Sequence, residues 1–164
     1  MRILGIDPGT ITMGYGVVES DGDHLNAISY GVLTPSSRSP IAQRLHTLHC
    51  GLIELIADYQ PSIVAIEQPF VAKNARSALA VGRAQAVAML AAAANGIPVY
   101  EYTPTQVKQS VTDYGGADKI RVQEMVKIQL GLPQIPQPDD AADALAVAMC
   151  HIQQTHMARV LARQ

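Results

Sequence analysis

The feature that most constrains this chain is an apolar run of strand length at its start, which ends in an acid and a turn. Residues 2–7 read Arg-Ile-Leu-Gly-Ile-Asp, and Pro8-Gly9 follows. A carboxylate at the end of a buried strand is costly to bury unless it is paired, hydrogen-bonded or bound to a metal ion. Asp before Pro-Gly is also ordinary turn chemistry. Residues 2–10 alone therefore leave two interpretations of Asp7 open.

The rest of the chain first reads as strands and then as helices alternating with strands. Two further strands, over 15–19 and 25–33, flank the hairpin signal Ser-Asp-Gly-Asp at 20–23. Ser39 suits a helix cap, with Pro40 in the first turn. Apolar spacing and breaking residues then predict helices over 41–59, 77–94, 104–111, 119–130 and 139–161, and strands over 63–66 and 98–102. This order predicts an α/β fold, with a mixed five-stranded sheet (a three-stranded antiparallel meander plus parallel strands) flanked by helices.

Length and composition predict one domain over residues 1–164. Cys50 and Cys150 form no Cys-x-x-Cys pattern, which argues against a zinc site and for a reducing, cytoplasmic setting. We expect no membrane partner, because no signal peptide and no apolar stretch of membrane-spanning length is evident. The net charge of −2 is unusual for a nucleic-acid-binding protein. If four acids held metal ions, the remaining balance would be +2.

Four acids are placed where they could meet. Asp7 and Glu67 each end a buried strand, and they reach the same sheet edge if those strands are parallel neighbours. Asp140 and Asp143 share one face at a helix start, although acids are also favoured there by the helix dipole. Converging carboxylates would repel each other unless a divalent cation joined them, and oxygen ligands favour Mg²⁺ or Mn²⁺. Two such ions can stabilise the attacking and leaving oxygens of a phosphodiester displacement. The residues thus predict a metal-dependent nuclease or phosphoryl-transfer enzyme.

Six short segments, in this order, carry a resemblance to a known family. They are Gly5-Ile6-Asp7-Pro8-Gly9-Thr10, Ile66-Glu67-Gln68, Phe70-Val71-Ala72-Lys73-Asn74, Val107-Lys108-Gln109, Ala117-Asp118-Lys119 and Asp140-Ala141-Ala142-Asp143-Ala144-Leu145-Ala146. Together they resemble RuvC, the family of bacterial Holliday-junction resolvases with a ribonuclease H-like fold. The resemblance covers almost the whole chain.

The resemblance implies catalytic roles for six residues. The metal-binding acids would be Asp7, Glu67, Asp140 and Asp143, with two Mg²⁺ ions per subunit that Mn²⁺ can replace. Family spacing selects Asp140 of the acidic pair and leaves Asp139 as a helix cap. Lys108 and Lys119 match lysines near the scissile phosphate, where they could neutralise developing charge.

The resemblance also implies a DNA-binding surface. Phe70 matches an aromatic residue that stacks on bases at the crossover, which is plausible for the only Phe in the chain, in a polar loop. We interpret four nearby residues as DNA contacts: Lys73, Asn74, Arg76 and Arg83. No acid lies between Glu67 and Glu101, so this stretch is locally basic. Asp113, Gly116 and Pro69 depart from the family pattern, which bears on DNA affinity and sequence preference.

The implied partners are four-way junction DNA, a second copy of the chain and the RuvA–RuvB branch-migration complex. The family nicks two opposed strands symmetrically and prefers short thymine-containing sequences. The helix predicted over 77–94 is either a dimer contact or an ordinary core helix. Three alternatives remain open here: a related nuclease acting on structured RNA, an actin-like or sugar-kinase ATPase (which would need two such domains), and a junction-binding scaffold without activity.

Overall fold

A five-stranded mixed sheet forms the centre of the computed structural model, which describes residues 1–22, 24–68 and 75–162. The strands are β1 (Arg2–Asp7), β2 (Met13–Asp21), β3 (His24–Leu33), β4 (Ile63–Glu67) and β5 (Val99–Tyr102), in the spatial order β3-β2-β1-β4-β5. The first three strands pair antiparallel, and β1, β4 and β5 pair parallel. The predicted fold class and meander are confirmed.

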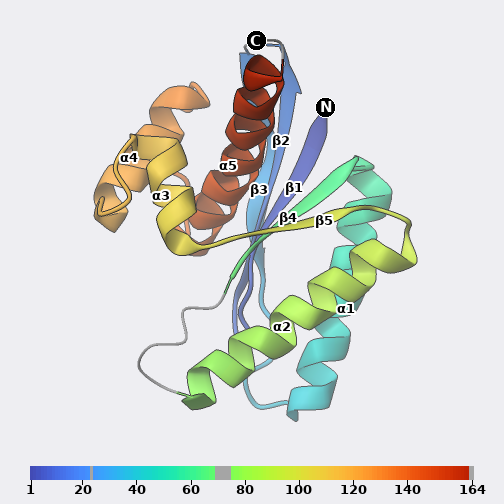
Figure 1. Ribbon diagram of the computed structural model, residues 1–164. Coiled ribbons are helices and arrows are strands. Elements are labelled where there is room, and N and C mark those ends of the chain that lie inside the picture. The colour runs from blue at the N-terminus through green and yellow to red at the C-terminus, as the bar shows by residue number, and fades with distance from the viewer. Residues whose placement is uncertain (23, 69–74, 163–164) are drawn as a thin grey trace.

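Within the described residues, five helices cover the two faces of this sheet (Figure 1). On one face lie α1 (Ile41–Tyr59) and α2 (Ala75–Ala94), and on the other lie α3 (Pro104–Thr112), α4 (Lys119–Gln129) and α5 (Asp139–Leu161). Each face has its own apolar core, one below α1 and α2 and one below α5. The predicted helices are all present, and α2 begins two residues earlier than predicted.

The prediction that Ser39 caps the first helix is wrong. Pro40 is the N-cap of α1, and no side chain caps that end. The backbone N–H of Ser39 instead donates to the carbonyl of Ser36, which places Ser39 in the preceding turn. The carbonyl of Pro40 accepts from Gln43 and Arg44, so the helix starts on backbone hydrogen bonds alone. In contrast, Thr103 caps α3 with the side-chain and backbone bonds of a capping box.

Strand periodicity decides which face of the sheet the two strand acids share. Alternate residues of a strand point to opposite faces. In β1, Leu4 and Ile6 belong to the core below α1 and α2, whereas Ile3 belongs to the core below α5. Asp7 has the same parity as Ile3 and therefore faces α5. The same alternation in β4 directs Glu67 to the α5 face, because Ala65 lies in that core.

Two glycines let α5 pack directly on the sheet. A Cβ atom on Gly5 would lie 2.1 Å from the carbonyl oxygen of Ala144, and one on Gly14 would lie 2.0 Å from that of Asp140. The side chains that α5 presents to the sheet are also small, because alanines recur along its buried length. This close approach brings the first turn of α5 down onto the end of β1.

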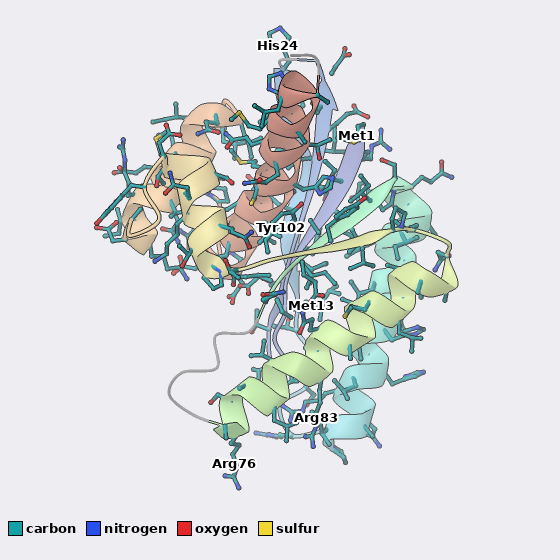
Figure 2. The ribbon with its side chains drawn as sticks, viewed as in Figure 1. Met1, Met13, His24, Arg76, Arg83 and Tyr102 are labelled. Carbon is teal, nitrogen blue, oxygen red and sulfur yellow. The ribbon has the colours of Figure 1, made fainter. Side chains whose placement is uncertain are left out.

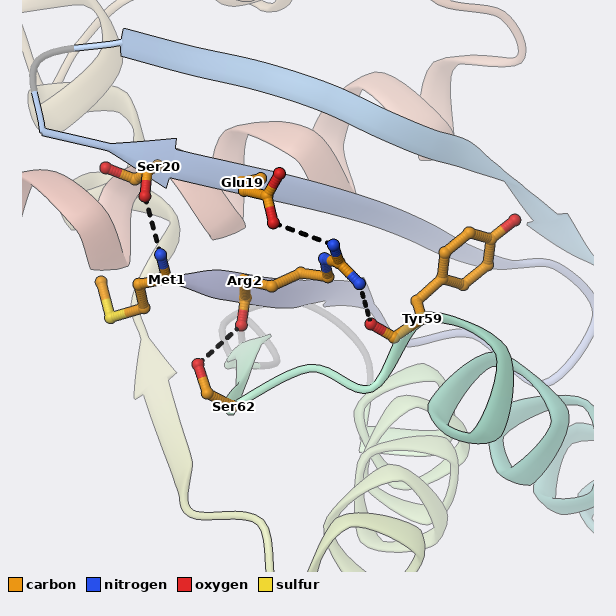
Figure 3. Close-up of polar contacts among 6 residues, drawn as sticks. All are labelled: Met1, Arg2, Glu19, Ser20, Tyr59 and Ser62. Carbon is orange, nitrogen blue, oxygen red and sulfur yellow. Dashed lines mark hydrogen bonds and ion pairs between the residues drawn. The ribbon is translucent and has the colours of Figure 1, made fainter.

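The opposite end of β1 is held by polar contacts (Figure 3). The guanidinium of Arg2 donates to the carbonyl of Tyr59 at 2.7 Å and to the carboxylate of Glu19 at 2.9 Å. The hydroxyl of Ser62 donates to the carbonyl of Arg2 at 2.9 Å. These contacts tie β1 to β2 and to the loop before β4, so both acid-bearing strands are fixed at the end remote from their acids.

The helix α2 keeps an apolar outer face. Leu79 and Leu90 are 56% and 62% exposed, and apart from Gln85 its buried residues are alanines, such as Ala84 and Ala88. By length and composition alone α2 could cross a membrane, a test that a core helix also passes. Its packing on α1 places it in the globular fold.

Candidate active site

The four acids predicted to act together meet at one end of the sheet. Asp7 ends β1 and Glu67 ends β4, one position beyond the parallel pair Ile6–Ile66. Asp140 and Asp143 lie in the first turn and a half of α5, above these strand ends. We call Asp7, Glu67, Asp140 and Asp143 the acidic set.

The strand acids are held in an environment that opposes their ionisation. The pKa of Asp7 is raised to about 8, chiefly by burial and then by the negative charges of the other three acids. Burial and the charge of Asp143 likewise raise the pKa of Glu67 to about 7, against the opposing charges of Lys108 and Lys119. Carboxyl groups perturbed in this way are typical of functional sites.

Lys119 sits between two acids of α5. Its Nζ lies 3.0 Å from Oδ2 of Asp143 and 3.4 Å from Oδ2 of Asp139. Burial would lower the pKa of Lys119, but these two carboxylates outweigh it and raise that pKa. Asp118 caps α4 by accepting from the backbone of Arg121, which fixes the start of the helix that carries Lys119.

Two hollows flank Glu67. One, of about 200 Å³, is lined by a polar wall of Glu67, Asp143, Lys108 and Lys119 over the apolar residues Pro104, Val107, Val122 and Ala146. The other, of about 190 Å³, lies between the strand ends and α2 and is lined by Asp7, Pro8, Glu67, Gln68, Ser77, Ala78, Val81 and Pro104. The first therefore joins two acids to two lysines, and the second opens toward the start of α2.

The donor set fits hard divalent cations. Carboxylate oxygens are the ligands that Mg²⁺ and Mn²⁺ prefer. A cation among these acids would also remove the repulsion that raises the pKa of Asp7 and of Glu67. In the described part of the chain, no three His, Cys, Asp or Glu side chains are gathered closely enough to hold an ion as they stand. Asp143 is instead paired with Lys119.

The predicted DNA contacts are placed in part. Arg76 and Arg83 are exposed on the first half of α2, on the side of the molecule where that helix begins (Figure 2). Ser77, next to Arg76, lines the hollow that contains Asp7 and Glu67. The predicted contacts Phe70, Lys73 and Asn74 lie outside the described residues.

Sequence reasoning missed the role of Asp139. It is the first residue of α5, within the helix rather than a cap before it, and its carboxylate pairs with Lys119. The available signal was its spacing of four residues from Asp143, which places both acids on one helix face. Sequence reasoning also assigned no role to Gly14, which gives α5 room to approach the sheet.

Known proteins share both this sequence and this fold. The family model described as crossover junction endodeoxyribonuclease RuvC matches residues 3–151. A protein of that name from Dehalococcoides mccartyi is 52% identical over 99% of this chain and 98% of its own length, and one from Chloroflexus aggregans is 56% identical over 92% of each.

Solved structures agree with this assignment. The structure of Thermus thermophilus RuvC in complex with Holliday junction substrate has a TM-score of 0.91 and 36% identity, and covers 96% of each chain. The yeast mitochondrial Holliday junction resolvase Ydc2, with a TM-score of 0.64 and 15% identity over 94% of this chain and 82% of its own, shares the fold. This chain belongs to the RuvC family of crossover junction endodeoxyribonucleases.

Proposed function

We propose that this protein resolves Holliday junctions in homologous recombination and DNA repair by nicking two opposed strands symmetrically. The observation that carries the proposal is the meeting of the acidic set with Lys108 and Lys119 at one end of the sheet, in a chain of this family. Residues 1–164 would act as a single nuclease domain in the cytoplasm.

We infer that the acidic set holds two Mg²⁺ ions per subunit, with Mn²⁺ as a substitute. Such ions, when bound, stabilise the attacking and leaving oxygens of a phosphodiester displacement. Asp7 and Glu67 must release their protons to serve as ligands, because a carboxylate binds metal in its ionised form. Their raised pKa values therefore predict cation binding that strengthens as the pH rises through about 7 to 8.

The two lysines would bind and orient the scissile phosphate. Lys108 and Lys119 come from different helices and line the same hollow as Glu67 and Asp143. Apolar side chains complete the lining of that hollow and lower its polarity, which strengthens the attraction of a lysine for developing negative charge. Carboxylates and lysine ammonium groups on the walls of one hollow suit a site that must hold both metal ions and a phosphodiester.

The junction would lie across the start of α2. Arg76 and Arg83 are exposed there and would contact the phosphate backbone, together with Lys73 and Asn74. Phe70 would stack on an unpaired base at the crossover. The position of Ser77 in the hollow of Asp7 and Glu67 supports this placement, because it brings the helix start next to the acids.

Symmetric nicking needs two copies of the site, and we propose a homodimer formed through α2. The exposed Leu79 and Leu90 lie on one side of this helix with the exposed Ala86 and Ala93 between and beyond them. Arg83, four residues after Leu79, borders this stripe, so the dimer interface would adjoin the DNA-binding surface. An apolar stripe of this kind on a soluble protein is typical of an interface. The RuvA–RuvB branch-migration complex would deliver the junction to this dimer.

A junction-nicking assay tests this function. We expect paired cuts on two opposed strands of a four-way DNA junction with Mg²⁺ or Mn²⁺, at short thymine-containing sequences, and no cuts with a chelator. A linear duplex of the same sequence and a structured RNA are the controls. Cleavage in the presence of chelator, preference for the RNA, or cuts confined to one strand would contradict the proposal.

A further inference from the structure

Lys119 pairs with two acids that occupy different depths of the site. Asp143 is the inner partner, with a side chain 25% exposed, and lines the hollow of Glu67 and Lys108. Asp139 is the outer partner, with a side chain 51% exposed. The two acids are four residues apart, so they lie one helical turn apart on the same face of α5. One lysine thus bridges an acid inside the acidic set and an acid outside it.

The inner acid has two competing roles. The function proposed above assigns Asp143 to the cations, yet its carboxylate lies 3.0 Å from Nζ of Lys119. A carboxylate that turns to a cation gives up part of its contact with a lysine. Lys119 would then lose its nearer partner in the state in which it is needed beside the phosphate, and the repulsion of a nearby cation would push it outward.

We propose that Asp139 is a positioning residue, which keeps Lys119 at the site when Asp143 turns to the cations. The inference rests on the proposed metal-dependent function. Lys119 is already 3.4 Å from Asp139 and has only to shorten that contact. The pair with Asp139 tightens as the pair with Asp143 is released, so the ammonium group stays at the mouth of the hollow. No covalent bond is made or broken in this exchange of ion pairs, and no proton moves.

Asp139 has an obvious structural role that the test must separate. An acid in the first turn of a helix interacts favourably with the helix dipole. Removal of its charge would also weaken cation binding by simple electrostatics. Neither effect requires Lys119, whereas the positioning role disappears when Lys119 is absent. The dependence on Lys119 is therefore the measurement that distinguishes them.

The experiment is a double-mutant cycle on Mn²⁺ binding without DNA. Free Mn²⁺ is counted by its electron paramagnetic resonance signal in titrations of the full chain, the variants Asp139→Asn and Lys119→Met, and their combination. Because the exposed pair between these residues would tighten when the ion binds, we expect Asp139→Asn to weaken Mn²⁺ binding about two- to fivefold more when Lys119 is present than when it is Met. Asp139→Glu, which keeps the charge, restores most of this factor.

Two controls fix the interpretation. Glu124→Gln makes the same change of charge at an exposed acid of α4, which pairs with Arg121 at 3.9 Å, and should show no dependence on Lys119. Lys119→Gln repeats the cycle with another uncharged side chain. An equal effect of Asp139→Asn with and without Lys119 overturns the positioning role and leaves the proposed function intact. Absence of Mn²⁺ binding in the unmodified protein overturns both.

Discussion

Replacement of Asp7 by Asn should stabilise the cation-free protein while it abolishes nicking. The pKa of Asp7 is about 8 in the folded protein, against an ordinary value of 3.8. Between these values the unfolded chain is ionised and the folded protein keeps the proton, so stability falls as the pH rises. An Asn side chain has a similar shape and no charge to bury. The gain from Asp7→Asn should therefore grow with pH.

The size of this growth follows from the raised pKa. Each pH unit between the two pKa values costs at most about 1.4 kcal/mol, so the rise from pH 5.5 to pH 8 gives a ceiling of about 3 kcal/mol. Glu67 titrates in the same range and shares the repulsion with Asp7, which lowers the contribution of Asp7 alone. We expect the difference in free energy of unfolding between variant and unmodified protein to increase by about 1–3 kcal/mol across this range.

Urea unfolding at pH 5.5 and pH 8, with a chelator and at one protein concentration, measures this difference. The same variant should bind a four-way junction nearly as well as the unmodified protein and should not nick it. Saturating Mg²⁺ should stabilise the unmodified protein at pH 8, because the cation binds only the folded state. The variant should gain less stability, because it lacks the Asp7 carboxylate as a ligand. A stability difference that stays constant or shrinks with pH would falsify the reasoning about buried charge. Nicking at the unmodified rate would remove Asp7 from the catalytic set.

Three further predictions address the phosphate site, the dimer and the close packing of α5. Lys108→Met should slow single-turnover nicking by about 10²- to 10³-fold and change junction affinity far less, as expected of a group that stabilises developing charge. Equal losses of nicking rate and junction affinity would make Lys108 only a binding residue. Leu90→Asp should convert the proposed dimer to a monomer in sedimentation experiments, whereas Ile128→Asp, at an equally exposed aliphatic residue of α4, should leave it dimeric. Gly5→Ala should cost about 3 kcal/mol or more in chemical unfolding, because the added Cβ meets the backbone of α5; Gly82→Ala on α2, where a Cβ meets nothing within 4 Å, should be neutral or stabilising.

The sheet was predictable because its signals are local. A strand such as β1 shows an apolar run of the right length, and the turn at Gly22 has the positive φ that its hairpin needs. Helix periodicity predicted α1 correctly. Its first residue, however, depended on whether the free backbone N–H groups at the helix start are capped by a side chain or left to backbone contacts. Ser39 has the side chain of a cap, and the turn before α1 uses its backbone instead. Such alternatives differ by about 1 kcal/mol, which neighbouring contacts easily override.

The acidic set was predictable in membership and only partly in arrangement. The ends of β1 and β4 bring Asp7 and Glu67 to one edge by strand periodicity and parallel pairing, which the sequence pattern contains. Whether Asp140 and Asp143 reach that edge depends on the docking of α5 on the sheet. That docking rests on Gly5 and Gly14, whose need for a missing side chain is visible only when the helix is in place.

The amino-acid sequence by itself determined the order of strands and helices, the four acids and their likeness to one family, because these depend on residue types and short spacings. Only the tertiary structure decided which carboxylates pair with which lysine side chains. It shows Lys119 shared between Asp143 and Asp139, and Glu67 between two hollows. It also decided the protonation of Asp7, because a pKa near 8 needs burial and three neighbouring charges that come from distant parts of the chain. Desolvation and Coulomb interaction act through space, so the opening strand and its acid acquire their chemistry from the helix that folds onto them.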